Sequence, residues 1–336
     1  MKAVGYRQPL PIEHPESLQD IELPVPRPGP RDLLVRVRAV SVNPVDTKVR
    51  SSSPPAAGPF KVLGWDAVGT VEAVGSAVSS FQVGDRVYYA GAIDRAGANS
   101  ELHVVDERIV AKAPQSLDDA QAAALPLTAI TACELLFDRL RVARNGNEGR
   151  SLLVIGGAGG VGSMLIQLAR RLTRLKVIAT ASRPASRRWC LDLGAHDVID
   201  HAQPLAAQLR AIGIDAVDMV AALTQTPQHY AQIVEALAPQ GQLAVIDDME
   251  GLDVMKLKSK SISLHWELMF TRALYQTADM GEQGRLLAEV AALVDAGQLR
   301  STVGEHLGRI DAAHLRRAHA LIESGRAVGK IVLSGF

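Results

Sequence analysis

The chain has 336 residues, of which 47% are hydrophobic and 21% are charged, an ordinary balance for a globular protein with well-filled cores. This length exceeds that of one compact core, so two domains are expected. The 36 Lys and Arg residues are balanced by 36 Asp and Glu residues. A protein that binds a phosphate backbone usually carries a basic excess, so nucleic acid is not expected as a partner.

Cysteine usage and the N-terminal segment indicate where the protein works. Cys133 and Cys190 are far apart in the sequence and fit neither a disulfide framework nor a zinc cluster. Residues 1–20 contain no apolar run of the kind found in a signal peptide. The most apolar windows, such as 151–161, are short and rich in Gly, and a membrane helix requires ~20 apolar residues. We therefore expect a cytoplasmic protein without a membrane span.

Residues 2–110 are typical of an antiparallel β domain. Short β runs at 33–42, 69–75 and 86–91 are separated by turns rich in Pro and Gly. The alternation of apolar and charged residues in LVRVRAV predicts a half-buried strand. The first helix of the following region is expected to begin with Ser116 as its N-cap.

From residue 151 onward, apolar strands alternate with helical segments. This pattern predicts a parallel sheet covered on both faces, and six strands make a doubly wound Rossmann sheet. The expected strands are 151–155, 175–181, 197–200, 216–222, 242–247 and 262–266. The Rossmann fold does not need the elements that follow its sixth strand, which are helices near 282–295 and 312–323 and a strand at 329–333. We therefore expect these elements to return to the β domain.

The strongest motif is the sequence GGAGGVG at 156–162, which lies between an apolar strand and an amphipathic helix. Gly157, Gly159 and Gly162 fit the G-x-G-x-x-G pattern of a dinucleotide-binding loop. The tight turn, the close approach of the pyrophosphate and the packing of helix on strand each require a glycine. We expect the pyrophosphate at the helix N-terminus, which includes Gly160 and Val161.

The end of the next strand indicates which dinucleotide is bound. NAD-binding proteins place Asp or Glu about 20 residues beyond the loop, where it binds the ribose 2'-hydroxyl. Here the sequence is Thr180-Ala-Ser182-Arg183, followed one turn later by Arg187. A hydroxyl and guanidinium groups can bind a 2'-phosphate, and no acid repels it. We therefore expect NADPH; a solvated basic helix face would explain the arginines but not the missing acid.

The whole chain resembles the medium-chain dehydrogenase/reductase superfamily, in particular its quinone oxidoreductase (zeta-crystallin-like) branch and the zinc-type alcohol dehydrogenase-like subgroup. The stretches that carry the resemblance are SVNPVDTKVR (41–50), GWDAVGTVEAVGSAVSSFQVGDRV (64–87), AAALPLTAITA (122–132), GGAGGVG (156–162) and HALIESGRAVGKIVL (319–333). The resemblance implies an α/β fold in which a Rossmann domain (123–266) is inserted in a GroES-like β domain (1–122 and 267–336). It also implies an active site in the cleft between the domains and, commonly, a homodimer formed through the Rossmann sheet.

The residues at the zinc positions of the superfamily depart from its pattern. Zinc alcohol dehydrogenases carry Cys at the position of Asn43, His at that of Trp65, and a third ligand, usually Cys, near Leu127 and Thr128. Asn43, Trp65 and Leu127 cannot supply the three nitrogen or sulfur ligands of a catalytic zinc. Residues 90–100 also contain no Cys, so the four-cysteine structural lobe is missing. We expect no metal at either position.

The resemblance also assigns roles in the active site. The amide of Asn43 is expected to hold the substrate or a bound water, and Asp46 matches an acid found at this loop throughout the superfamily. Lys48 can attract an oxyanion or donate a proton, or can be an ordinary surface lysine. Thr128 lies on the segment that leads to the nicotinamide in relatives, or is a helix hydroxyl bonded to the preceding turn. Lys330 is expected to reach the cofactor.

Three residues are expected to line the substrate pocket. Trp65 and Tyr89 lie in the β domain, where aromatic residues also commonly belong to the core. His265 ends the sixth Rossmann strand, and a lone histidine usually serves local hydrogen bonding. No residue pattern identifies the substrate that these side chains would surround.

These observations favour an NADPH-dependent, zinc-independent oxidoreductase that reduces quinones or α,β-unsaturated carbonyl compounds. Two alternatives stay open. One is reduction of an enoyl thioester, and the other is a non-catalytic NADPH-sensing or RNA-binding protein. The neutral charge and the absence of a basic aromatic patch argue against RNA.

Overall fold

The computed structural model describes residues 1–56 and 59–336, and the chain divides into two compact units. The β-rich unit comprises Met1–Ile130 and Phe270–Phe336, and the Rossmann unit comprises Thr131–Met269. The boundaries expected from the sequence, after residues 122 and 266, fall slightly earlier in the chain than these.

The β-rich unit is built mainly from strands, and its alternating sequence explains the exposure of its longest one. In β3, Val35 and Val37 are buried while Arg36 and Arg38 are exposed, as period-2 alternation predicts. The elements of this unit are β1 (Lys2–Tyr6), β2 (Gln19–Glu22), β3 (Asp32–Val42), α1 (Pro44–Ser52), β4 (Lys61–Val62), β5 (Ala67–Val74), β6 (Arg86–Tyr89), β7 (Leu102–Asp106), a 3₁₀ helix (Glu107–Ile109), β8 (Val110–Lys112), α2 (Asp119–Ala123), α3 (Pro126–Cys133, which continues into the Rossmann unit), α9 (Thr271–Leu274), α10 (Glu282–Asp295), β15 (Val303–His306), α11 (Ala312–Glu323) and β16 (Lys330–Ser334).

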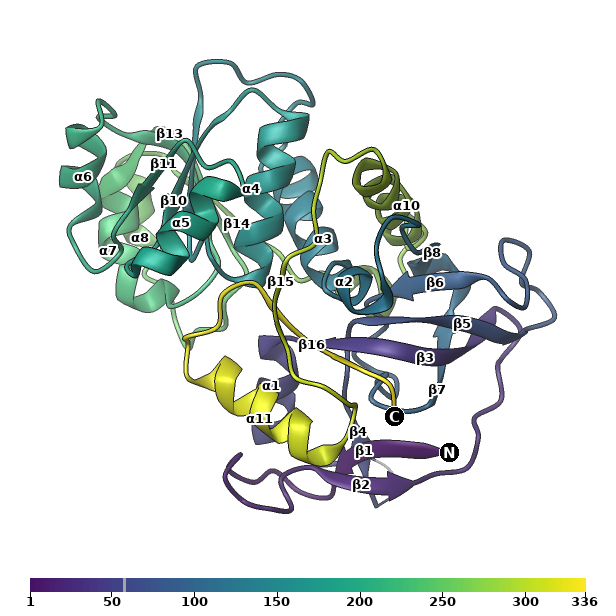
Figure 1. Ribbon diagram of the computed structural model, residues 1–336. Helices are drawn as coiled ribbons and strands as arrows, with labels where there is room; N and C mark the ends of the chain where they lie inside the picture. The colour runs from purple at the N-terminus through teal and green to yellow at the C-terminus, as the bar shows by residue number, and fades with distance from the viewer. Residues whose placement is uncertain (57–58) are drawn as a thin grey trace. The chain divides into compact units, whose positions relative to one another are not determined.

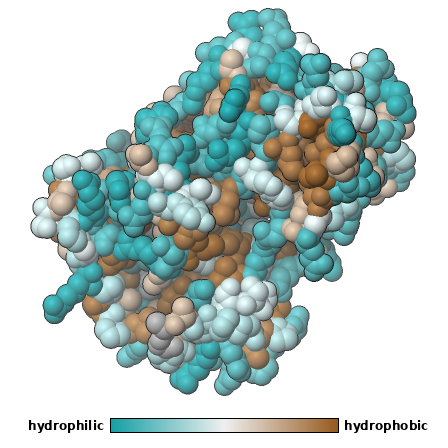
Figure 2. Space-filling model, turned by 180° about the vertical axis from the view of Figure 1, so that it is seen from behind, coloured by the Kyte–Doolittle hydropathy of each residue, from teal (hydrophilic) through white to brown (hydrophobic). Residues whose placement is uncertain are grey.

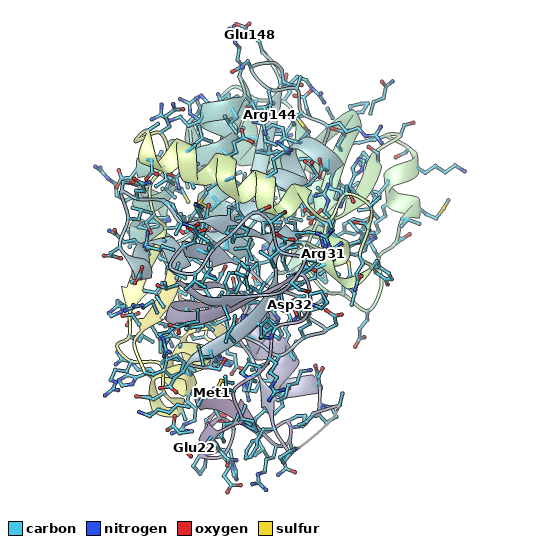
Figure 3. All side chains as sticks on the ribbon, turned by 90° about the vertical axis from the view of Figure 1, so that its right-hand side faces the viewer. Met1, Glu22, Arg31, Asp32, Arg144 and Glu148 are labelled. Carbon is cyan, nitrogen blue, oxygen red and sulfur yellow. The ribbon has the colours of Figure 1, made fainter. Side chains whose placement is uncertain are left out.

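The first and last parts of the chain meet in one sheet of this unit. Its order is β15-β16-β3-β5-β6-β8, and β7 also pairs with β3. Figure 1 shows the last strand, β16, in yellow beside the purple β3, with which it pairs antiparallel. A smaller sheet, β2-β1-β4, holds the N-terminus, where Met1 and Glu22 lie close together (Figure 3). The predicted return of the tail to the β domain is therefore confirmed.

The Rossmann unit contains one six-stranded parallel sheet in the order β11-β10-β9-β12-β13-β14. This is the doubly wound order 3-2-1-4-5-6, and all six predicted strands are present. Every residue of β9 is buried, as expected for a strand covered on both faces. The elements are a π-helix (Glu134–Arg139), β9 (Ser151–Ile155), α4 (Gly160–Leu172), β10 (Lys176–Thr180), α5 (Pro184–Asp192), β11 (Asp197–Ile199), α6 (Leu205–Ala211), β12 (Val217–Ala222), α7 (Thr226–Ala236), β13 (Leu237–Val245), α8 (Met255–Lys258) and β14 (Ser263–Trp266).

One sequence expectation about the region after residue 115, the N-cap of its first helix, needs correction. Helix α2 is capped by Asp118, whose side chain accepts from the amide of Gln121, whereas the side chain of Ser116 donates to Asp295. In addition, the helical run Asp119–Arg139 is long and apolar enough to pass a test for a membrane span. Its most apolar window is 83% buried inside the protein, which is typical of a core helix.

Helix α11 packs against α1 and buries a histidine. His319 is 0% exposed, and neither ring nitrogen has a hydrogen-bond partner among the described residues. Burial lowers the pKa of His319 to about 3, and the charge of Arg50 on α1 acts in the same direction. The folded protein therefore keeps His319 neutral under conditions in which the unfolded chain would protonate it.

We expect acid to destabilise the β-rich unit through His319. Its pKa is depressed from 6.5 to about 3, so stability is lost as the pH falls below 6.5, at about 1.4 kcal/mol per pH unit. The variant His319→Leu cannot titrate. Its urea midpoint relative to the wild type should therefore be higher at pH 5 than at pH 7.5, and an equal difference at both pH values would contradict the assignment.

Candidate functional site

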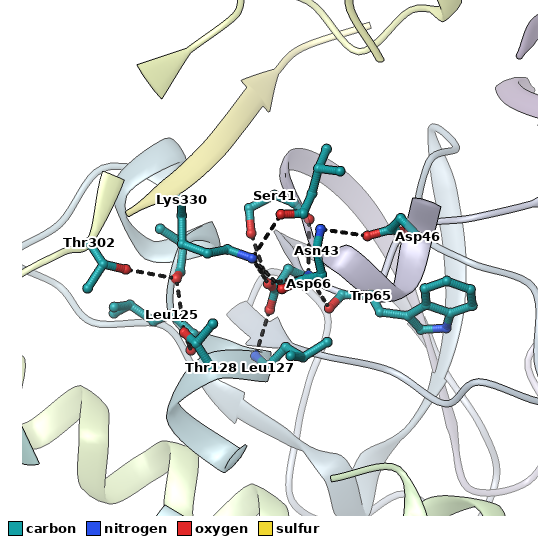
Figure 4. A network of polar contacts seen from close by, with 12 residues as sticks. Ser41, Asn43, Asp46, Trp65, Asp66, Leu125, Leu127, Thr128, Thr302 and Lys330 are labelled. Atoms are coloured by element: carbon teal, nitrogen blue, oxygen red, sulfur yellow. Dashed lines mark hydrogen bonds and ion pairs between the residues drawn. The ribbon is translucent and has the colours of Figure 1, made fainter. Parts of the chain in front are cut away.

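A buried polar network surrounds Asp66 in the β-rich unit (Figure 4). The carboxylate of Asp66, which is 0% exposed, accepts at one oxygen from the hydroxyl of Ser41 at 2.9 Å and from the amide of Asn43 at 2.8 Å. Its other oxygen accepts from the backbone N–H of Leu127 at 2.7 Å. The Nζ atom of Lys330 completes the set with an ion pair at 3.1 Å. The network thus joins segments that are distant in the sequence.

Lys330 is the only cation that these contacts bring to Asp66, and its three donors are all used. Besides the ion pair, Nζ donates to the backbone oxygen of Val42 at 3.1 Å and to Oδ1 of Asn43. The side chain is 3% exposed. A buried lysine of this kind is stable only with full hydrogen bonding and a counter-charge, and both are present here.

The side chain of Asn43 is committed within this network. Its Nδ2 group donates to Asp66 and, at 3.3 Å, to the backbone oxygen of Trp65, while its Oδ1 accepts from Lys330. Asn43 is 1% exposed. In this structure its amide is therefore bonded inside the protein, and the sequence expectation that it holds the substrate stays a prediction.

Asp46 supports the same loop from the first turn of α1. Its carboxylate accepts from the backbone N–H of Asn43 at 2.8 Å and from that of Gly64 at 3.0 Å. Burial raises the pKa of Asp46 to about 7, although these hydrogen bonds and the charge of Lys330 oppose the shift. Burial also raises the pKa of Asp66 in spite of the ion pair. Burial of both carboxyl groups is therefore unfavourable in itself, and the hydrogen bonds that they accept hold the loop that leads into α1.

The residues around Asp66 do not fit a catalytic zinc. Asn43, Trp65 and Leu127 provide no nitrogen or sulfur ligand set, and the ammonium group of Lys330 beside Asp66 repels a divalent cation. Across residues 1–56 and 59–336, no group of three or more His, Cys, Asp or Glu side chains could hold a metal ion.

The other residues predicted for the active site of the β-rich unit have different surroundings. Lys48 is exposed on α1. The hydroxyl of Thr128 donates to the backbone oxygen of Leu125 at 3.0 Å, in the preceding turn. Trp65 and Tyr89 are buried: Trp65 donates to the backbone oxygen of Ala92, and Tyr89 bonds and stacks against His103. Trp65 and Tyr89 thus make the contacts of core residues. Their predicted role in the substrate pocket stays a prediction.

The dinucleotide loop of the Rossmann unit has the shape that its glycines predict. A Cβ on Gly157 would lie 2.7 Å from the Cβ of Ala179, and one on Gly162 would lie 2.5 Å from the backbone oxygen of Gly156. At Gly159, the N-cap of α4, a Cβ would meet only that same oxygen, at 3.5 Å. The loop therefore lies against β10 at Gly157 and against its own first residues at Gly162. It is open at Gly159, where the amides of Gly160 and Val161 begin the helix.

The end of β10 carries the residues predicted to distinguish NADPH from NADH. Ser182 and Arg183 are exposed, and the guanidinium of Arg183 has no hydrogen bond or ion pair to any described residue. Arg187 differs, because its guanidinium donates to the backbone oxygens of Ala181 at 3.4 Å and Val198 at 2.8 Å. Arg183 is thus the more available of the two for an anionic ligand.

A buried acidic pair in the Rossmann unit was missed by the sequence analysis. Glu134, on the π-helix, and Glu267, just after β14, are both nearly fully buried, and Arg139 forms an ion pair with Glu267 at 2.7 Å and lies 4.0 Å from Glu134. Burial, followed by the charge of Glu134, raises the pKa of Glu267 to about 9. The i→i+5 spacing of the π-helix places Glu134 and Arg139 one above the other. No residue pattern in the sequence predicts this proximity.

His265 lies on β14, shortly before Glu267 in the sequence. It is half-buried, and its Nε2 atom has no partner among the described residues. Burial and the charges of Arg141 and Arg139 lower the pKa of His265. These effects favour the neutral imidazole, and the predicted role of His265 in the substrate pocket stays a prediction.

Comparisons with known proteins identify the family. Residues 29–115 match the alcohol dehydrogenase GroES-like domain, and residues 193–333 match the zinc-binding dehydrogenase family. A "Zinc-type alcohol dehydrogenase-like protein" of Staphylococcus epidermidis is 38% identical over 337 residues, covering 99% of each chain. The chain therefore belongs to the medium-chain dehydrogenase/reductase superfamily, a superfamily of oxidoreductases, and the predicted resemblance is confirmed.

Solved structures agree with this assignment. A protein from Rhizobium etli, provisionally described as a zinc-dependent alcohol dehydrogenase, has 54% identity and a TM-score of 0.95, covering 100% of this chain and 98% of its own. The Escherichia coli quinone oxidoreductase, solved with NADPH, has 25% identity and a TM-score of 0.84, covering 99% and 100%. An NAD-dependent alcohol dehydrogenase has 28% identity and a TM-score of 0.84, covering 99% of both. Family membership alone therefore does not decide between the two cofactors.

We expect removal of Lys330 to destabilise the β-rich unit strongly. The variant Lys330→Met leaves the carboxylate of Asp66 buried without its counter-charge, at a cost of about 3–5 kcal/mol. The double variant Lys330→Met/Asp66→Asn removes both charges and should recover part of the loss. Urea unfolding measures this coupling when the wild type is compared with Lys330→Met, with Asp66→Asn and with the double variant. If the losses of unfolding free energy in the two single variants simply added in the double variant, the ion pair would not stabilise the protein.

Proposed function

We propose that the chain is an NADPH-dependent oxidoreductase that reduces small electron-poor substrates, quinones or α,β-unsaturated carbonyl compounds, without zinc. The observation that carries the proposal is the glycine loop at 156–162 followed by a strand whose end lacks an acid. The loop supports a dinucleotide because its glycines leave room for a pyrophosphate at the N-terminus of α4.

The preference for NADPH rests on the end of β10. Ser182 and Arg183 are exposed there, and Arg183 carries a guanidinium with no described partner. A 2'-phosphate forms charge-assisted hydrogen bonds with such a group, whereas the 2'-hydroxyl of NADH lacks the acid that would accept from it. Arg187 would act mainly by holding the ends of β10 and β11 together, since two of its donors bond to backbone oxygens there.

Bound NADPH would supply a hydride to the electron-poor carbon of the acceptor. The chain then needs to orient the acceptor and stabilise the negative charge that develops on its oxygen, by hydrogen bonds in place of a metal. Lys48, exposed on α1, is the cation that we propose for this task. Asn43 and Asp46 would act as positioning residues, because both are buried and hold the loop that leads into α1.

Independence from zinc is proposed on the same grounds. The charge that a metal would bring to this loop is supplied by Lys330, which is bonded to Asp66 and Asn43. A zinc ion bound nearby would have to displace a fully bonded ammonium group and would then find no ligand set of its own.

We also propose that the protein forms a homodimer through the Rossmann sheet. Strand β14 is the edge strand of that sheet, and its backbone can pair with a second copy. Trp266 and Leu268, at its end, are 53% and 52% exposed. Exposed apolar side chains of this size are expected where another chain binds; Figure 2 shows, in brown, where apolar residues gather on the face of the molecule seen from behind.

We predict a clear preference for NADPH over NADH that depends on Arg183. The variant Arg183→Ala should bind NADPH about tenfold to a hundredfold more weakly, because a charge-assisted contact is lost, and should bind NADH unchanged. The matched control is Arg188→Ala on the same helix, since Arg188 is paired with Asp192. Fluorescence titration measures both affinities, and equal binding of the two cofactors by the wild type would show that the missing acid is not decisive.

The activity itself is tested by following NADPH oxidation with panels of quinones, enones and enoyl thioesters. We expect turnover with quinones or enones. Turnover confined to enoyl thioesters would replace the proposed substrate class. Tight NADPH binding with no oxidised substrate in any panel would instead support a sensing role.

A further inference from the structure

The first turn of the dinucleotide loop is hydrogen-bonded to one residue, Thr180, at the end of β10. The side chain of Thr180 is 1% exposed, and its Oγ1 atom accepts from the backbone N–H of Gly156 at 3.1 Å. Its backbone oxygen accepts from the N–H of the next residue, Gly157, also at 3.1 Å. Two consecutive backbone N–H groups at the start of the loop thus donate to the same threonine.

These two hydrogen bonds fix the turn where the chain reverses after β9. Gly156 has φ +83°, a left-handed conformation that only glycine adopts readily. Gly157 has no room for a side chain, because a Cβ there would lie 2.7 Å from that of Ala179 and 3.1 Å from Sγ of Cys190. Gly156 is partly buried, and an N–H without an acceptor is costly where water is excluded, so without the Thr180 hydroxyl this amide would have to turn toward another acceptor.

The far end of the loop is held by a separate chain of hydrogen bonds. The hydroxyl of Ser163 donates to the backbone oxygen of Gly159 at 2.7 Å, and the indole N–H of Trp189 donates to that hydroxyl at 2.8 Å. With Gly159 anchored in this way, the orientation of residues 156–159 depends on how the first turn of the loop is held. Thr180 supplies that anchor through the hydrogen bond between its hydroxyl and the backbone N–H of Gly156.

We propose that Thr180 is a positioning residue for cofactor binding: its hydroxyl holds the first turn of the glycine loop so that the amides at the start of α4 face the pyrophosphate. This inference rests on the proposed function, since it presupposes a dinucleotide on the loop. It assigns to Thr180 an effect on cofactor affinity and none on the chemical step.

The test compares Thr180→Val, which removes the hydroxyl and keeps the branched shape, with Thr180→Ser, which keeps the hydroxyl. We expect Thr180→Val to weaken NADPH binding about tenfold, with kcat at saturating NADPH unchanged, and Thr180→Ser to bind nearly as well as the wild type. Hydrogen exchange without cofactor should be faster at residues 156–159 in Thr180→Val only.

The matched control is Thr173→Val. Thr173 is also a buried threonine of this unit, and its hydroxyl likewise accepts a backbone N–H, that of Leu175 at 3.2 Å, but at the opposite end of α4. This variant should bind NADPH like the wild type. Equal losses in both valine variants, or a folded Thr180→Val protein with wild-type affinity, would overturn the inference. A wild-type protein that binds neither NADPH nor NADH would instead refute the proposed function, and unchanged exchange at 156–159 in Thr180→Val would refute the anchor independently of any cofactor.

Discussion

The ion pair between Lys330 and Asp66 is the interaction on which the organisation of the β-rich unit depends. It joins the last strand of the chain to residues near its beginning and, through the backbone N–H of Leu127, to the start of α3. Burying two charges costs several kcal/mol per ion unless every donor and acceptor is paired. Here Ser41 and Asn43 complete the pairing, so the network holds only when all four segments are in place.

The same ion pair bears on the chemistry that we propose for the site. In a zinc alcohol dehydrogenase the cation beside this loop is a metal that polarises the substrate oxygen. In this chain Lys330 donates all its hydrogen bonds to Asp66, Asn43 and the backbone. Its charge stabilises the protein and is not directed at a substrate. This is why we propose an acceptor that is already electron-poor, such as a quinone or an enone, in preference to an alcohol.

The sequence predicted most of the fold because the relevant signals are local. Apolar runs and glycine positions located the six Rossmann strands, and helical periodicity located α10 and α11. The glycine loop was predicted because its spacing between a strand and a helix is a local signal, although the atoms that exclude a side chain at Gly157 belong to Ala179 and Cys190, which are distant in the sequence. The start of α2 was misplaced because Ser116 and Asp118 are both good N-caps, and only the contact of Ser116 with Asp295 decides between them.

Partnerships between distant residues could not be predicted in this way. Lys330 and Asn43 are separated by 287 positions, and each was expected to face a ligand because its sequence neighbours match a family motif. The pairing of Glu134 with Glu267 depends on a π-helix and on β14. Such contacts arise from tertiary packing, and neither hydrophobic period nor spacing encodes them.

Metal content tests the central claim most directly, because the proposed site works without a catalytic zinc. The protein would be produced in zinc-supplemented medium, purified without chelator and analysed for zinc, and its NADPH-dependent activity would be measured before and after dialysis against a chelator. We expect far less than one zinc per chain and equal activity in both preparations. About one tightly bound zinc per chain, lost together with the activity on dialysis, would contradict the account.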